Sequence, residues 1–306
     1  MSKIENLVIS GGGPNGLIAY GAVQQLAEKH IWSIDQLKNI YATSFGAIIS
    51  VIIVLGYEWD DLNDYIVKRP WEKIIQLDFK NYINAISECG LIIDGFCKKA
   101  LTPLLEAKDI DVDITLKDFC EYVNVKLHFF TVNVNGTPLD LLELNSDTDD
   151  TLTLIQAIEM TTAVPIVFPP VFYKDKCLID GGIICNYPVQ QALLSDEVSF
   201  ENTLGIYMRF DDDHVPVTPE GNIFELVSHT FKKMIKHIGI QNASTGILKY
   251  EICCTVGGEG GFGIWDNIMK SPDTRSELIQ KGRDYATPLI EQLKTPTSLS
   301  SSEETE

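Results

Sequence analysis

The stretch Ile4-Glu5-Asn6-Leu7-Val8-Ile9-Ser10-Gly11-Gly12-Gly13-Pro14-Asn15-Gly16 indicates the fold class of this 306-residue chain. Its first part, Ile4 to Ser10, resembles a buried strand centred on the apolar Leu7-Val8-Ile9, and the glycines that follow mark a tight turn. Leu17 to Lys29 then has the pattern of a helix. The order of strand, glycine turn and helix predicts a β-turn-α unit of an α/β protein.

A second unit of the same kind follows before Tyr57. Asn39 to Ala42 has strand character, Thr43-Ser44-Phe45-Gly46 forms the turn, and the apolar stretch from Ala47 to Leu55 predicts a buried helix. Two successive β-turn-α units predict a mainly parallel central sheet flanked by helices. Functional loops of such proteins lie at the carboxyl ends of the strands, so the two turns are expected at the same edge of the sheet.

The rest of the chain is predicted to complete a single domain over residues 1–294. Its further predicted elements are helices and loops over Tyr57 to Val125, including a helix over Leu116 to Tyr122 capped by Thr115, a hairpin of Lys126 to Val134 and Leu139 to Leu144, a helix over Thr151 to Met160, a strand over Thr203 to Phe210, a helix over Ile223 to Ile238 and a closing helix over Arg275 to Leu293. Gly257 to Gly263 is predicted to be a surface loop or the hinge of a lid. The polar, acidic tail over residues 295–306 is predicted to be disordered.

The charge of the chain limits its partners. The formal net charge is −19 and the sequence pI is near 4.6. Nucleic-acid binding draws most of its affinity from Lys and Arg, so we expect no nucleic-acid partner. The same charge disfavours attraction to an anionic membrane, and any membrane contact is expected to be transient and peripheral. The oligomeric state is left open by the sequence.

The cysteines and the first residues bear on the compartment. The chain has seven cysteines without a CxxC pair, which favours free thiols in a reducing compartment. Met1 to Asn6 lacks the long apolar region of a secretory signal. The longest apolar stretch, Ala47 to Leu55, is about half of the ~20 residues that a membrane span needs. We therefore expect a cytoplasmic protein that is not secreted.

Ser44 lies in a turn that has the form of a nucleophile elbow. In such an elbow a sharp turn from strand to helix exposes a serine hydroxyl at the helix N-terminus. Gly46 would let the helix pass close to the strand, whereas Ala42 stands where the usual pattern has a glycine. A serine at this place is also typical of a simple helix N-cap, so the motif alone leaves both interpretations open.

The glycines Gly11, Gly12 and Gly13 are candidate oxyanion-hole donors. Successive backbone N–H groups at a helix N-terminus form a concave site for an anion. Gly11-x-Gly13-x-x-Gly16 also fits the pattern of a dinucleotide-binding turn. That alternative needs an acidic residue at the end of a strand about 20 positions on, and the chain instead leads there to the Ser44 turn.

Asp180 is the candidate general base. It follows the strand-like Cys177-Leu178-Ile179 and precedes Gly181 and Gly182, which allow a tight turn that exposes its carboxylate. In a desolvated cleft such a carboxylate can accept a proton from a serine. Asp-Gly is also a strong signal for a hairpin turn, which is the alternative. None of the five histidines has a sequence context that suggests a base.

Taken in order, three motifs resemble the patatin-like phospholipase family. They are Gly11-Gly12-Gly13-x-x-Gly16, then Thr43-Ser44-x-Gly46, then Asp180-Gly181-Gly182 with Asn186-Tyr187-Pro188 close behind. The stretch Thr161-Thr162-Ala163-Val164-Pro165 with Phe168-Pro169-Pro170-Val171 is also similar to the segment before the aspartate in that family. The resemblance covers roughly residues 4–195.

The resemblance implies a three-layer α/β sandwich related to α/β hydrolases and a lipid acyl hydrolase of the phospholipase A type. It implies that Ser44 attacks the ester carbonyl, that Asp180 takes the serine proton, and that the glycine loop stabilises the oxyanion. It implies no cofactor and no metal, and phospholipids or other acyl lipids as substrates. In the family a basic residue usually stands at Asn15, so contact with a lipid phosphate is expected to differ here.

Two other functions are compatible with the same motifs. One is a soluble carboxylesterase or thioesterase that uses the Ser44 and Asp180 pair without visiting a bilayer. The other is a membrane-interaction protein that keeps the fold but has little activity. Activity that depends on Ser44 and on vesicles would separate these alternatives from a phospholipase.

Overall fold

Eight strands form one mixed sheet in the computed structural model, which describes residues 3–74, 89–90, 95–211, 217–219, 226–227, 229–230, 233–234, 246–257 and 262–294. The strands are β1 (Asn6–Ile9), β2 (Asn39–Thr43), β3 (Lys126–Asn133), β4 (Asp140–Leu144), β5 (Val171–Tyr173), β6 (Lys176–Asp180), β7 (Thr203–Phe210) and β8 (Tyr250–Val256). Their order is β5-β6-β3-β2-β1-β7-β8, and β4 pairs with β3 outside this path. The pairings that join β3, β2, β1, β7 and β8 are parallel, and those of β4, β5 and β6 are antiparallel.

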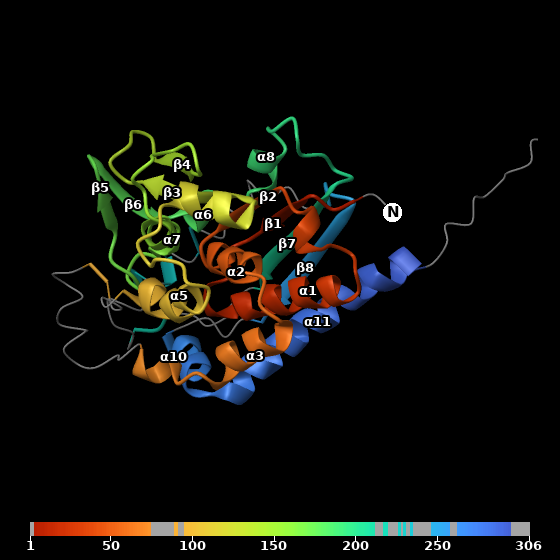
Figure 1. Ribbon diagram of the computed structural model, residues 1–306. Helices are drawn as coiled ribbons and strands as arrows, with labels where there is room; N and C mark the ends of the chain where they lie inside the picture. The colour runs from red at the N-terminus through yellow and green to blue at the C-terminus, as the bar shows by residue number, and fades with distance from the viewer. Residues whose placement is uncertain are drawn as a thin grey trace, which may run out of the picture.

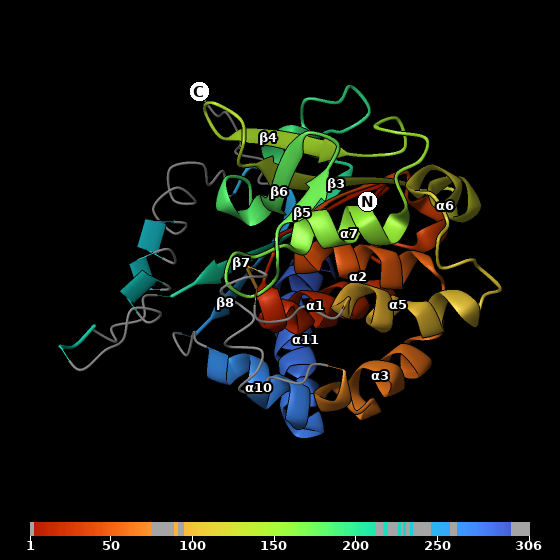
Figure 2. The same cartoon turned by 90° about the vertical axis from the view of Figure 1, so that its left-hand side faces the viewer.

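Helices cover the sheet, most of them on one face (Figure 1). They are α1 (Gly16–Glu28), α2 (Phe45–Val54), α3 (Trp59–Lys68), α5 (Phe96–Glu106), α6 (Leu116–Val123), α7 (Leu154–Thr162), α8 (Val189–Ala192), α10 (Phe262–Lys270) and α11 (Pro272–Lys294), with short 3-10 turns that include η1 (Gly13–Asn15), η3 (Trp71–Lys73) and η4 (Gly181–Ile183). The long α11 runs along the outer side of α1 (Figures 1 and 2), and Arg283 binds Glu28 through both guanidinium NH2 groups.

The central strands alternate their side chains between two hydrophobic clusters, as the period of a strand requires. On β1, Leu7 and Ile9 belong to the large cluster beneath the helices, whereas Val8 belongs to a small cluster on the other face. On β2, Tyr41 belongs to the same small cluster, which α8 covers. Every residue of β1 and β2 is buried, which explains why apolar residues follow one another in the middle of both strands.

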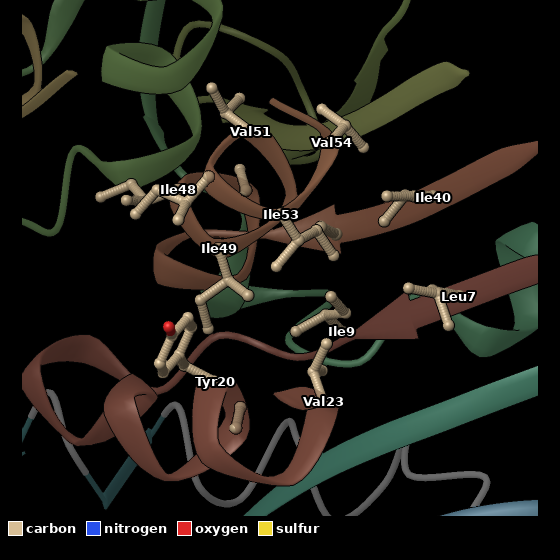
Figure 3. Packing of buried hydrophobic residues seen from close by; sticks show 14 of the residues in the cluster. Leu7, Ile9, Tyr20, Val23, Ile40, Ile48, Ile49, Val51, Ile53 and Val54 are labelled. Atoms are coloured by element: carbon tan, nitrogen blue, oxygen red, sulfur yellow. The ribbon is translucent and has the colours of Figure 1, made fainter. Parts of the chain in front are cut away.

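The large cluster forms where α1 and α2 meet the sheet. Figure 3 shows Ile49 and Ile53 of α2 above Tyr20 and Val23 of α1, with Ile9 of β1 beside them. These side chains are almost fully buried. Because α1 and α2 each begin directly after one of the two turns predicted from the sequence, this packing holds the two turns at fixed positions.

The predicted fold class is confirmed, together with both β-turn-α units, the Thr115 cap of α6, the β3–β4 hairpin, the strand β7 and the closing helix α11. Helix α7 begins at Leu154 and not at Thr151, because Thr153 and Gln156 form a capping box there. The loop predicted up to Gly263 is shorter than expected, because α10 begins at Phe262. Most of the helix predicted over Ile223 to Ile238 and the whole tail 295–306 lie outside the described residues. The single domain over residues 1–294 stays a prediction.

Candidate active site

Ser44 lies at the sharp turn between β2 and α2. Its backbone has φ 56° and ψ −129°, in the positive-φ region that side chains with a Cβ rarely adopt. Such a conformation persists only where the surrounding structure enforces it, and it is common at active sites. Ser44 does not use its side chain to cap α2, so the N-cap interpretation of the serine does not account for its conformation.

Gly46 allows the elbow to be tight. A Cβ atom at this position would lie 2.6 Å from the carbonyl oxygen of Ile9 and 2.9 Å from that of Ser10. Both distances are too short for a real contact, so α2 passes β1 at a separation that only glycine permits. Ala42 is fully buried in β2, and the elbow forms despite its methyl group.

Thr161 at the end of α7 supports the elbow from outside. Its Oγ1 atom accepts a hydrogen bond from the backbone N–H of Ser44 at 3.0 Å and donates to the carbonyl oxygen of Phe130. Thr161 is fully buried. The Ser44 N–H therefore already has a hydrogen-bond acceptor, and the Ser44 side chain lines the pocket described below. Thr161 belongs to the family-like stretch of the sequence, where no local pattern indicates this role.

Asp180 ends β6 and caps the 3-10 turn η4. Its Oδ1 atom accepts a hydrogen bond from the Gly182 N–H at 2.6 Å. The hairpin-turn alternative for Asp180-Gly181 is wrong, because β6 forms its hairpin with the preceding strand β5 and the chain continues from Asp180 into η4. The side chain is 4% exposed, so the carboxyl group is buried in the protein.

The Ser44 hydroxyl lies close enough to the Asp180 carboxyl group to affect its pKa. Burial raises the pKa of Asp180 to about 7, and the Ser44 hydroxyl and the Gly182 N–H offset part of this rise. The Oδ2 atom is shielded from solvent and has no hydrogen-bond partner of regular geometry among the described residues, so the contact with Ser44 is a loose one. Catalytic hydrogen bonds are often long before a substrate binds.

The glycine loop is fastened to the segment that follows Asp180. The Gly11 N–H donates to the carbonyl oxygen of Asn186 at 3.0 Å, and the Asn186 side-chain amide donates to the carbonyl oxygen of Gly11 at 3.1 Å. The Thr43 hydroxyl donates to the carbonyl oxygen of Cys185 at 2.8 Å. Residues 185 and 186 therefore connect the glycine loop, the elbow and the Asp180 turn.

The remaining predicted site residues also lie at this edge of the sheet. Gly12 precedes η1, Gly13 has φ 51° within it, and Gly16 begins α1 against the Phe45 ring. Gly181 packs against the Phe130 backbone, where a side chain would not fit. Asn15 is buried within η1 and is not presented to solvent.

An apolar pocket opens beside Ser44. The space that its walls enclose is narrow, and the roughly 270 Å³ around it includes open solvent. Gly13 and Ser44 line one part of it, and Ile48, Phe96, Phe168 and Trp265 are among the side chains that line the rest. Among the described residues, no group of three or more His, Cys, Asp or Glu side chains is arranged to hold a metal ion. The described helices include none with the length and apolar character that crossing a bilayer requires.

A family model for patatin-like phospholipases matches residues 7–193, more than half of the chain. The chain belongs to the patatin-like phospholipase family. The patatin-like region contains Ser44, Asp180 and the glycine loop, and it ends before β7. Trp265 of the pocket wall lies outside it.

Several proteins resemble this patatin-like chain. "Probable lipid hydrolase 463L" of Invertebrate iridescent virus 6 is 25% identical over 189 residues, 62% of this chain and 63% of that protein. "Uncharacterized protein R571" of Acanthamoeba polyphaga mimivirus is 22% identical over 67% of this chain and 65% of its own length. "Uncharacterized protein YqhO" of Bacillus subtilis (strain 168) is 27% identical over 74% of this chain and 79% of that protein. The chain thus spans less than two thirds of the two viral relatives.

The crystal structure of VipD from Legionella pneumophila has the same fold. The similarity covers 95% of this chain and 67% of that chain, with a TM-score of 0.55 and 15% sequence identity. At this identity the likeness concerns the fold of the patatin-like chain alone.

Proposed function

We propose that this protein is a lipid acyl hydrolase of the phospholipase A type that cleaves fatty-acyl esters through Ser44 and Asp180. The observation that carries the proposal is the serine held at positive φ beside a buried carboxyl group whose pKa is raised to about 7. Membership of the patatin-like phospholipase family and the viral relative named a probable lipid hydrolase support a lipid ester as the substrate.

In the proposed reaction the Ser44 Oγ atom bonds to the ester carbonyl carbon while its proton passes to Asp180. The tetrahedral intermediate collapses, the bond to the leaving alcohol breaks, and Asp180 returns the proton to that alcohol. Water then attacks the acyl-serine while its proton passes to Asp180, the bond to Ser44 Oγ breaks as Asp180 returns the proton to that oxygen, and the fatty acid is released. Atoms and protons balance over the two steps without a cofactor.

The proposed oxyanion hole has fewer donors than the sequence predicts. The Gly11 N–H is bound to the Asn186 carbonyl, so Gly12 and Gly13 are the proposed donors from the glycine loop. Gly13 lines the pocket beside Ser44, which supports this assignment. Donors that are fixed before the reaction stabilise the developing negative charge most effectively.

The pocket supports an acyl lipid in preference to a polar ester. Its lining residues among the described part of the chain carry no charge, and most are apolar. Because the chain has a net charge of −19, we propose that contact with a membrane is peripheral and transient.

The test is release of fatty acid from mixed phospholipid vesicles in the presence of a metal chelator. The wild type should be active, and Ser44→Ala and Asp180→Ala should each lose at least a hundredfold in kcat. Ser50→Ala is the matched control, because Ser50 is a buried serine of α2 whose hydroxyl only donates to the Gly46 carbonyl. It should remain active.

A short water-soluble ester separates the alternatives. Ser44-dependent cleavage of this ester without activity on vesicles would replace the phospholipase proposal by a soluble esterase. If neither substrate is cleaved by any variant, the proposal of a hydrolase fails and a membrane-interaction protein becomes the better hypothesis.

A further inference from the structure

Glu251 of β8 binds the segment that follows Asp180. The Tyr187 hydroxyl donates to Oε1 of Glu251 at 2.7 Å, and the backbone N–H of Gly246 donates to Oε2. β8 lies at the end of the sheet beside β7 (Figure 1), and it comes after the region that the family model matches, residues 7–193. A side chain from outside the patatin-like region therefore holds a residue inside it.

Tyr187 reaches Glu251 over the backbone of β7. A Cβ atom on Gly205 would lie 1.9 Å from the Tyr187 hydroxyl oxygen and 3.2 Å from the ring atom Cζ. Because Gly205 has no side chain, the phenol can pass close to the strand and reach Glu251, which pairs with Gly205 in the sheet. Tyr187 is 9% exposed, and burial together with the Glu251 carboxylate raises the pKa of its hydroxyl well above the ordinary value. The hydroxyl therefore keeps its proton at neutral pH and donates it to this hydrogen bond.

The two residues before Tyr187 join it to the candidate active site. The Cys185 carbonyl accepts from the hydroxyl of Thr43 in the elbow. Asn186 binds the N–H of Gly11 through its own carbonyl and the carbonyl of Gly11 through its side chain. Supporting contacts of this kind keep a site within the geometry that a reaction needs. Since Asn186 directly precedes Tyr187, a shift of Tyr187 would move the group that holds the glycine loop.

We propose that Glu251 is a positioning residue, which fixes Tyr187 and, through Asn186, the glycine loop that supplies the proposed oxyanion donors. The proposal rests on the function proposed above and goes beyond it by giving a role to a residue outside the patatin-like region. Glu251 does not line the pocket beside Ser44, so it should affect the rate of the reaction more than the binding of the substrate.

The first test measures kcat and KM on a short soluble ester. Glu251→Ala removes the anchor and should lower kcat about tenfold, because small displacements of groups that act in the transition state slow a reaction. KM should change by less than about twofold. Glu251→Gln keeps an oxygen that can accept from Tyr187, so its kcat should stay within about threefold of the wild type.

Glu28→Ala is the matched control for a general loss of stability. It breaks the contact with Arg283 at the end of α1 that lies far from the glycine loop. It should lower the unfolding temperature and change kcat by less than about twofold.

A double-mutant cycle tests the path through Tyr187. Tyr187→Phe keeps the ring, removes the hydroxyl and should lower kcat about tenfold, and it tests the contact even if Glu251→Ala does not fold. The double variant Tyr187→Phe/Glu251→Ala should also lose about tenfold, and not about a hundredfold, because both changes break the same hydrogen bond. An additive loss, an unchanged kcat in Glu251→Ala or an equal loss in Glu28→Ala overturns the proposal.

Hydrogen exchange tests the link without turnover. The Gly11 N–H donates to the Asn186 carbonyl, so Glu251→Ala should raise the exchange rate of this amide about tenfold, whereas a peptide from β3 should exchange as in the wild type. A wild type that cleaves no ester would refute the proposed function, and faster exchange of Gly11 in Glu251→Ala would then still support the link between Glu251 and the loop. Exchange at the wild-type rate would refute that link in an active and in an inactive protein alike.

Discussion

The hydroxyl of Thr161 links Ser44 to β3, since its Oγ1 accepts from the Ser44 N–H at 3.0 Å and donates to the Phe130 carbonyl. Both partners are main-chain groups of buried residues, so a variant without this hydroxyl is expected to leave both hydrogen bonds unmade. A backbone held at positive φ needs such support, because the relaxed conformation of a serine lies elsewhere. Thr161 therefore supports the backbone of Ser44, the proposed nucleophile.

Thr161→Val should destabilise the protein and slow the reaction. Valine fills the same space but leaves the Ser44 N–H and the Phe130 carbonyl unpaired, at a cost of about 2 kcal/mol in the free energy of unfolding. A displacement of Ser44 should lower kcat by about tenfold to a hundredfold. Thr161→Ser keeps the hydroxyl and should restore most of both quantities. Denaturant unfolding and steady-state kinetics would check this, and a valine variant with wild-type kcat would refute the positioning role.

The pKa of Asp180 sets the expected pH dependence. A general base works in its ionised form, so kcat/KM should rise with pH and reach half of its maximum near pH 7, where burial places the pKa of Asp180. An ordinary aspartate, by contrast, would give a half-maximum near about pH 4. The measurement is kcat/KM on a soluble ester over this range. A profile that is flat between these two values would exclude Asp180 as the base.

Asp180→Asn should stabilise the protein at alkaline pH while abolishing activity. The folded state keeps a proton on Asp180 up to about pH 7, whereas an unfolded aspartate releases it near about pH 4. The buried group therefore costs the folded state nothing below about pH 4. As the pH rises from there through 7, the free energy of unfolding of the wild type falls by up to about 4 kcal/mol. The asparagine carries no charge and avoids the penalty.

Thermal unfolding of both proteins at about pH 4 and pH 8 measures this effect. Asp180→Asn should unfold at a higher temperature than the wild type at pH 8, and the difference should shrink at pH 4. Asp113→Asn, in an exposed surface ion pair with Lys98, is the control and should change stability by less than about 1 kcal/mol at either pH. A lower melting temperature of Asp180→Asn at pH 8 would contradict the buried-charge account.

The sequence predicts the parts of the site that depend on local pattern. Strand, turn and helix follow each other within a few residues at Gly11 to Gly16 and at Thr43 to Gly46, and apolar runs and glycines mark them directly. The Asp180 turn is harder, because Asp-Gly serves equally well in a hairpin and in the 3-10 turn that is present. Only the pairing of β6 with β3 and β5 separates these two conformations, and that pairing is not local.

The supporting residues could not be assigned roles for the same reason. Thr161 contacts a residue 117 positions away, and Asn186 contacts one 175 positions away. Neither has a local pattern that distinguishes it from other polar residues near a helix end. The sequence gives even less indication that Trp265 lies at the site, because α10 begins within a glycine-rich stretch that predicts a loop. Tertiary packing, and not propensity, determines these three positions.

Asn186 leads to a prediction that separates positioning from simple stability. Asn186→Ala removes the amide that holds the Gly11 carbonyl and should lower kcat about tenfold with little change in KM, because the glycine loop acts mainly in the transition state. Asn186→Asp adds a negative charge near Asp180, the proposed base. The Asn186 Oδ1 and Asp180 Oδ1 atoms lie 2.8 and 2.9 Å from the place that a Cβ on Gly182 would occupy.

A second carboxylate at this distance disfavours ionisation of Asp180, so the pH at half-maximal kcat/KM should rise by about one unit in Asn186→Asp and stay in place in Asn186→Ala. A purely structural defect would lower activity in both variants and leave the midpoint unchanged. Asn135→Asp, which adds the same charge in the exposed turn between β3 and β4, is the matched control. Equal midpoints in Asn186→Asp and Asn135→Asp would mean that Asn186 does not lie close enough to Asp180 to influence the proton transfer.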